Sequence, residues 1–276
     1  MAFSLYVPKP ARAVLAIVVL LALGGATYQG VTTSLERRRY PHPGRLIDVG
    51  GHQLQIHCTG RGAPIVVLEA PAAGLSASWT RVQTLLEPIT RVCSYDRAGL
   101  GWSERGDGPF DPERVPLELQ TLLAGAGEKP PFIIAGAGIG AAFARAFAVR
   151  FPPTVRGVVL LDEPTAGHDS LDRNTLGQVP DVMPWLARVG ILRLTGTPRR
   201  AGREPAVRAF MNRPDHLTRA ASELARWDDT LHLTGEAALA ATRVHLVAAE
   251  LPVPLGDDRG ADAAVVAIRR ALDALR

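Results

Sequence analysis

The chain has 276 residues, which is enough for one large α/β domain or two small ones. Apolar residues make up 47% of it, so a sizeable core is expected and disorder is not. The net charge is only +4, the arginines are mostly scattered and aromatic residues are few, which argues against a nucleic-acid-binding surface. The two cysteines form no CxxC pair, so we expect no metal site, and we expect no cofactor.

The first 35 residues contain a long apolar segment. No charged residue occurs between Ala13 and Leu35, and a helix needs about 20 apolar residues to span a membrane. We expect an uncleaved membrane anchor over residues 1–35 that contacts membrane lipid through residues 13–31. The alternative is a signal peptide with Gly24-Gly25-Ala26 as its cleavage site.

Basic residues flank the apolar segment on both sides. Lys9 and Arg12 precede it and favour a cytoplasmic N-terminus, whereas Arg37-Arg38-Arg39 follow it and favour the opposite orientation. We expect the body of the protein to lie outside the cytoplasm. A linker is predicted over residues 36–45 and a folded domain over residues 46–276.

The folded domain alternates between predicted strands and helices. Residues 46–58 show the alternation of a β-hairpin around a Gly-Gly turn. Short apolar runs typical of buried parallel strands follow, and between about residues 164 and 241 short helical patterns replace them. The sequence therefore predicts a three-layer α/β fold with a mostly parallel sheet and a helical lid over residues 164–241. The predicted strands are 64–69, 91–95, 132–135, 155–162 and 243–249, and the predicted helices include 76–89, 112–126, 182–194, 204–212, 216–226 and 261–275.

Residues 131–142 combine an apolar strand, a glycine-rich turn and a helix-like run of small residues. That succession is the architecture of a nucleophile elbow, whose pattern is Gly-x-Ser-x-Gly. Here the frame is Gly136-Ala137-Gly138-Ile139-Gly140. Because Gly138 stands where the attacking serine belongs, no acyl-enzyme can form at that position.

Several blocks accompany this frame: His57-Cys58-Thr59-Gly60, Val66 to Ala70, Ser78-Trp79, Arg91 to Ser103 and Val158 to Asp162. Together they resemble the α/β-hydrolase family, and more narrowly its bacterial members with an N-terminal hydrophobic segment. The resemblance covers roughly residues 43–275. It implies a catalytic set of an elbow serine, an acid, a late histidine and backbone N–H donors for the oxyanion.

Other parts of that set are changed as well. Pro71 has no N–H to donate, although it stands in the loop expected to bind the oxyanion, and the N–H of Ile139 would be the second donor. The last histidine is His245, inside a predicted strand, and the chain after it is short enough to imply a deletion. Asp162 or Glu250 could fill the acid position. We expect these residues and Gly138 to form a vestigial site.

The expected function is that of a membrane-anchored pseudoenzyme. It would act as an accessory subunit or a binding module, with a membrane protein complex as a candidate partner. One alternative is an active serine-type hydrolase that uses other residues, of which Ser76, Ser78, Ser103, His168, His216 and His232 are the candidates. Another is a dinucleotide-binding protein that uses Gly136, Gly138 and Ala141, with Asp162 and Glu163 near the ribose.

Three further expectations concern single residue types. In the hydrolase fold the strand with Cys58 neighbours the strand with Cys93, so a disulfide is one interpretation and two buried thiols are the other. A disulfide would favour an extracytoplasmic body. The pair Asp96-Arg97 is expected to lock its loop through hydrogen bonds and an ion pair. The four tryptophans, Trp79, Trp102, Trp185 and Trp227, are expected in the core or in a pocket wall.

Overall fold

The fold is built on one seven-stranded sheet. The computed structural model describes residues 8–163, 182–195, 204–233, 236–242, 244–255 and 257–275. The strand order in this part of the chain is β1-β2-β4-β3-β5-β6-β7. The first two pairings are antiparallel and the other four are parallel, so the predicted mostly parallel sheet is confirmed. The strands are β1 (Arg45–Asp48), β2 (Gln53–Thr59), β3 (Ile65–Glu69), β4 (Val92–Tyr95), β5 (Phe132–Ala137), β6 (Val155–Leu161) and β7 (His245–Ala249).

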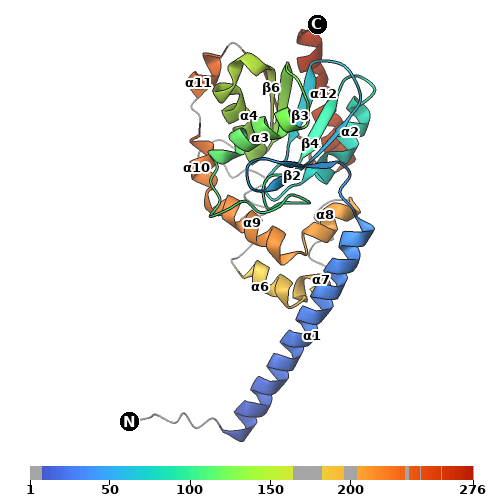
Figure 1. Ribbon diagram of the computed structural model, residues 1–276, viewed down its shortest axis with the longest axis vertical. Coiled ribbons are helices and arrows are strands. Elements are labelled where there is room, and N and C mark those ends of the chain that lie inside the picture. The colour runs from blue at the N-terminus through green and yellow to red at the C-terminus, as the bar shows by residue number, and fades with distance from the viewer. Residues whose placement is uncertain are drawn as a thin grey trace.

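Helices cover both faces of the sheet (Figure 1). On one face lie α2 (Thr80–Leu86), which follows the short helix η1 (Ser76–Trp79), and α12 (Asp258–Ala274). On the other face lie α3 (Arg114–Gly125) and α4 (Ile139–Arg150), and η2 (Pro152–Thr154) leads from α4 to β6. The central strands β3 and β5 are almost wholly apolar because both of their faces are buried in this way, and Glu69 at the end of β3 is the one charged residue in them.

Strand β3 shows this arrangement clearly. Val66 and Leu68 point into the core under α2 and α12, whereas Ile65 and Val67 point into the core under α3 and α4. Strand β3 ends at the buried carboxylate of Glu69, which lies at the carboxyl edge of the parallel strands. This is the edge at which the elbow follows β5.

The cysteines on the neighbouring strands β2 and β4 form a disulfide. Cys58 and Cys93 are register partners in the antiparallel pair, with their Cα atoms 4.0 Å apart. This separation is slightly below the usual range of about 4.4–6.8 Å. The structure thus has the disulfide and not the two reduced thiols.

The lid lies between β6 and β7 in the chain, as the sequence predicts. Each of its helices is short, and prolines begin or closely follow the start of several of them. The described lid helices are α6 (Met183–Arg188), α7 (Ile191–Thr195), α8 (Pro205–Phe210), α9 (Pro214–Ala225), α10 (Trp227–Leu231) and α11 (Glu236–Ala240).

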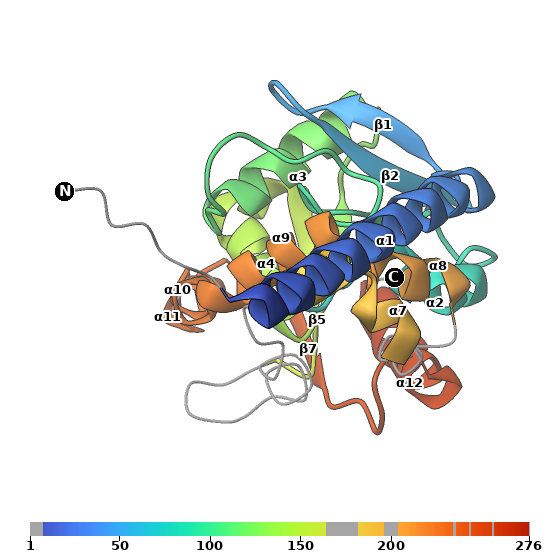
Figure 2. The same cartoon turned by 90° about the horizontal axis from the view of Figure 1, so that it is seen from below.

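The N-terminal helix α1 ends four residues later in the chain than the predicted anchor. It runs without interruption over Lys9–Arg39, and by length and composition it could cross a membrane. The first four residues of the predicted linker at 36–45 therefore belong to this helix. The last residue of that linker, Arg45, begins β1. Figures 1 and 2 show α1 leaving the body alongside the lid helices α6 and α7.

The disulfide generates a prediction about stability. It closes a loop over 35 positions, and loop closure of that length removes conformational entropy from the unfolded chain worth about 3–4 kcal/mol. We expect the double variant Cys58→Ala, Cys93→Ala to lose about that much free energy of unfolding, measured by denaturant titration of the detergent-solubilised full chain. Reductant should lower the native chain to the same level. A double variant as stable as the native chain would contradict the prediction.

Candidate functional site

The turn between β5 and α4 has the geometry of a nucleophile elbow. Gly138 adopts φ 55° and ψ −128°, in a region that residues with a Cβ atom rarely enter. A Cβ atom on Gly136 would collide with the carbonyl of Gly140, and one on Gly140 would collide with the carbonyl of Ala70. The two outer glycines are therefore required by close packing. The strand, turn and helix remain in place, and the position of the nucleophile has no side chain.

The loop after β3 lies beside this elbow and is held by the lid. Arg97 donates from Nη1 to the carbonyl of Ala70 at 2.7 Å and from Nη2 to that of Pro71 at 3.0 Å. Ala73, which adopts φ 54°, donates its N–H to the carboxylate of Glu223 on α9. As predicted, Pro71 has no N–H to offer. The loop that should bind an oxyanion thus directs one of its N–H donors to a protein carboxylate.

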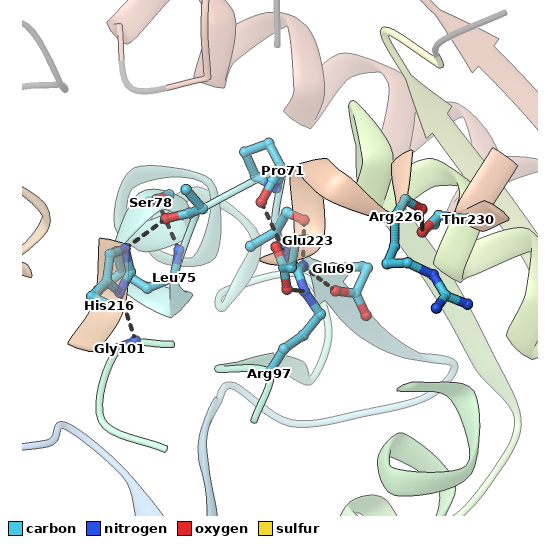
Figure 3. A network of polar contacts seen from close by, with 12 residues as sticks. Glu69, Pro71, Leu75, Ser78, Arg97, Gly101, His216, Glu223, Arg226 and Thr230 are labelled. Atoms are coloured by element: carbon cyan, nitrogen blue, oxygen red, sulfur yellow. Dashed lines mark hydrogen bonds and ion pairs between the residues drawn. The ribbon is translucent and has the colours of Figure 1, made fainter. Parts of the chain in front are cut away.

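Arg97 lies at the centre of a buried cluster of charges (Figure 3). Its guanidinium pairs with Glu69 at 2.7 Å and, through two parallel hydrogen bonds of 2.9 Å, with Glu223. The hydroxyl of Tyr95 donates to the same Glu69 carboxylate. The three charged side chains are at most 2% exposed. The ion pair expected for Arg97 exists, and its partners come from β3 and from the lid.

Burial acts to raise the pKa of these two acids, and the guanidinium of Arg97 acts to lower it. Burial disfavours ionisation of Glu223, but the attraction of Arg97 and the hydrogen bonds from it outweigh burial, so the pKa of Glu223 lies below its ordinary value. Burial has the larger effect on Glu69 and raises its pKa, although Arg97 acts against it. Glu223 is thus the acid that Arg97 holds ionised.

His216 is a second contact between the lid and this loop. Its Nδ1 accepts a hydrogen bond from the N–H of Gly101 at 3.2 Å, so Nε2 carries the proton and donates to the carbonyl of Ala73 at 2.9 Å. The ring is 2% exposed, and this burial lowers the pKa of His216 to about 4. Both ring nitrogens are occupied, so His216 is a neutral structural group in this arrangement.

The candidate acids have structural roles too. Asp162, with φ 49°, follows β6 and accepts a hydrogen bond from the N–H of Leu251 at 2.6 Å. Glu163 pairs with Arg145 of α4, and Glu250 is exposed at the end of β7. A dinucleotide site would require Asp162 or Glu163 on a ribose, but both carboxylates already have protein partners. The Ala70 carbonyl also packs closely against Gly140 in the glycine turn.

Two of the other candidate nucleophiles also have engaged hydroxyls, and the third, Ser76, is buried. The hydroxyl of Ser103 donates to the carbonyl of Asp96 at 2.6 Å and accepts from the N–H of Gln55 at 2.8 Å. The hydroxyl of Ser78 accepts from the N–H of Leu75. The N–H groups of Ser76 and Trp102 donate to the buried carboxylate of Asp96, which locks the loop as predicted.

The remaining candidate histidines are also accounted for. His232 is exposed and contacts the carbonyl of Asp228 through Nδ1, and His245 lies in β7 as predicted. His168 lies outside the described residues. Neither of the two described surface pockets is lined by Gly138, Ile139, Pro71 or Asp162.

The tryptophan prediction is wrong for one residue. Trp79 and Trp227 are buried, and Trp102 packs against Phe210 at the lid. Trp185 is 66% exposed on α6, because α6 lies on the outer side of the lid. The sequence also did not reveal Glu223 as the partner of Arg97; its only signal was an acidic residue on the apolar side of an amphipathic helix.

Comparisons with known proteins agree with the fold. No protein-family model matches the chain. A stretch of 97 residues is 39% identical to an AB hydrolase superfamily protein of Gibberella zeae, and it covers 35% of this chain and 30% of that protein. The chain thus spans about a third of the length of this relative. Since the relative is fungal, the resemblance is not restricted to bacterial proteins.

Solved structures share the fold at low sequence identity. The epoxide hydrolase CorEH matches with a TM-score of 0.61 at 17% identity, over 84% of this chain and 99% of that chain. A membrane phospholipase A, described as a bacterial virulence factor, matches with a TM-score of 0.58 at 17% identity, over 94% of this chain and 87% of that chain. At this level of identity the likeness concerns the fold alone.

The buried charge cluster generates a prediction about stability. The substitution Arg97→Met removes the guanidinium that pairs with both buried acids, Glu69 and Glu223, and removal of one partner of a buried ion pair costs about 3–5 kcal/mol. We expect a loss of that size in the free energy of unfolding. The matched control is Arg226→Met at the end of α9, because Arg226 pairs with Asp229 at the surface and such pairs contribute about 0–1 kcal/mol. Equal losses in both variants would contradict the assigned role of Arg97.

His216 generates a prediction about pH. Its pKa is about 4 in the folded chain and about 6.5 when unfolded, so its contribution to stability is complete above pH 6.5 and disappears as the pH falls towards 4. The stability lost in His216→Gln should therefore shrink by about 3 kcal/mol between pH 7 and pH 4. The free energies of unfolding of the native chain and of His216→Gln, compared across this pH range, measure this change. Burial raises the pKa of Asp96 to about 6, but Asp96 is present in both proteins and cancels. A difference in stability between the two proteins that does not change with pH would contradict the prediction.

Proposed function

We propose that this chain, whose fold is that of the α/β-hydrolases, is a membrane-anchored, non-catalytic protein that acts by binding. It would serve as an accessory subunit of a membrane protein complex or as a module that binds a small molecule. The observation that carries the proposal is Gly138 at the centre of an otherwise intact elbow. Covalent acyl transfer needs a nucleophile at that position, and glycine supplies none.

The neighbouring groups support the same proposal. An oxyanion site needs N–H donors directed at one point, but Pro71 has no N–H and the N–H of Ala73 binds Glu223. A general base needs an accessible ring nitrogen, but both nitrogens of His216 are engaged in the buried lid contact. The changes thus affect the nucleophile, the oxyanion loop and the base together.

The anchor is the second part of the proposal. The apolar residues of α1 are exposed on all sides of the helix, so lipid and not protein would cover them. Their exposed fractions run from 47% at Val19 to 71% at Leu21. The membrane phospholipase A shows that a protein named for its membrane location has this fold. We place the folded body outside the cytoplasm, in keeping with the disulfide between Cys58 and Cys93.

The competing function is an active serine-type hydrolase with a non-standard site. Hydrolases among the fold neighbours motivate it. The two functions differ in whether a serine of the native chain is activated. A fluorophosphonate probe labels activated serines, so we expect no labelling of the purified full-length chain. Labelling of Ser76, Ser78 or Ser103 would establish the competing function.

The proposal also predicts the result of restoring the hydroxyl. We expect Gly138→Ser to show no turnover of p-nitrophenyl esters above the native chain, because both nitrogens of the described lid histidine His216 are engaged and Pro71 interrupts the oxyanion loop. The φ of 55° makes serine strained there by about 1–3 kcal/mol, so a thermal melt should accompany the assay to establish folding. Measurable turnover by a folded variant would mean that the site is not vestigial.

A further inference from the structure

The lid helices α6 and α7 expose large apolar side chains. We define the α6–α7 surface by four residues, Val182, Trp185, Ile191 and Leu194. Their exposed fractions are 46%, 66%, 39% and 77%. Trp185 and Leu194 are among the most exposed large apolar residues of the folded body. A surface of this kind on a chain with an apolar helix beside it needs an occupant.

The α6–α7 surface lies next to the apolar part of α1. A Cβ atom on Gly25 would collide with the carbonyl of Val189, and Gly190 packs against Gly25 and Tyr28. Helix α1 therefore crosses the turn between α6 and α7 at Gly25. In Figures 1 and 2, α6 and α7 lie beside α1, on the side of the body from which α1 leaves.

The length of α1 sets the depth of this crossing. A helix rises about 1.5 Å per residue, so the wholly apolar run Ala13–Ala26 extends only about 21 Å. The hydrocarbon layer of a bilayer is about 30 Å thick. The layer must therefore extend beyond Ala26, to about Thr32, if it begins near Ala13. The crossing at Gly25 then lies within the layer or at its edge.

The residues of α1 beyond Ala26 are compatible with a hydrocarbon layer that extends to about Thr32. Tyr28, Val31 and Leu35 keep exposed fractions of 48%, 55% and 60%, although Tyr28 contacts Gly190 of the lid and Leu35 lines the groove between α1 and α8. The exposed parts of these side chains can contact lipid beyond Ala26.

The polar residues of the same stretch face the lid. The amide of Gln29 donates to the carbonyl of Asn212 at 2.8 Å and accepts from Nε of Arg193 at 2.7 Å. Arg193 also forms a two-bonded ion pair with Glu36. Polar groups in lipid must be satisfied within the protein, and here the lid satisfies them. The lid thus lies at the depth where α1 would otherwise expose polar groups to lipid.

We propose that the α6–α7 surface inserts into the interface of a phospholipid bilayer, in the leaflet that α1 enters. This proposal rests on the membrane anchor proposed above. Trp185 and Tyr28 have the apolar body and polar edge that favour the interface. The guanidinium of Arg188 lies 4.6 Å from the ring centre of Trp185, where it can reach lipid phosphates. The lid is then a membrane-bound element and not a free cover.

Depth-dependent quenching in the full-length chain tests the proposal. Both native cysteines are in the disulfide, so a single new cysteine can be labelled with the fluorophore NBD without reductant. The test variants are Trp185→Cys and Leu194→Cys. The matched control is Val266→Cys, which is 50% exposed on α12, and the reference inside the membrane is Leu20→Cys. The proteins are reconstituted into phosphatidylcholine vesicles that contain nitroxide-labelled phosphatidylcholine.

We expect nitroxide lipid to quench the probes at positions 185 and 194 several-fold more than the probe at position 266. If the probe at position 20 is quenched but those at positions 185 and 194 behave like the probe at position 266, the α6–α7 surface does not insert into the bilayer, whereas α1 does. If position 20 is not quenched, or is removed by processing, the anchor fails and the docking fails with it. Protection of positions 185 and 194 from both nitroxide lipid and aqueous iodide would assign the surface to a protein, such as a second copy, and would also overturn the proposal.

Discussion

The pairing of one guanidinium with two carboxylates holds the lid on the body of this protein. Arg97 follows β4, Glu69 ends β3 and Glu223 belongs to α9, so the three side chains join the sheet, the loop after β3 and the lid. All of them are almost completely buried. Separating the lid from the body would break the two parallel hydrogen bonds between Arg97 and Glu223. The lid is therefore held against the body by the same side chain that binds the loop above the elbow.

Close packing of glycines in the core explains why the elbow has its usual shape although glycine stands at the position of the nucleophile. The turn at Gly138 is set by the close approach of Gly136 to Gly140 and of Gly140 to the end of β3. These are packing contacts of the core, and they are needed whether or not a reaction takes place. Glycine adopts the required φ without the strain that serine would carry there. Loss of the hydroxyl thus removes a cost and leaves the fold unchanged.

Local patterns were sufficient to predict most of the fold and the changes at the elbow. The apolar runs identified β3 and β5 because strands buried on both faces consist mostly of apolar residues, and Gly138 and Pro71 are visible in the sequence itself. The partner of Arg97 could not be predicted, because Glu223 lies 126 positions away in a lid whose packing no local pattern encodes. The exposure of Trp185 was missed for a similar reason. Tryptophan is highly buried on average, but Trp185 lies on a helix at the outer side of the lid and is exposed.

The closed lid and the anchor together determine what kind of function this architecture allows. A hydrolase needs a lid that admits substrate and releases product, whereas the ion pairs of Arg97 favour a single closed arrangement. The lid is in turn joined to α1 by the buried contacts of Gln29 and Arg193. These two sets of polar contacts join the sheet, the lid and the anchor to one another. An arrangement of this kind fits the proposed role, in which the protein presents a fixed surface at a membrane.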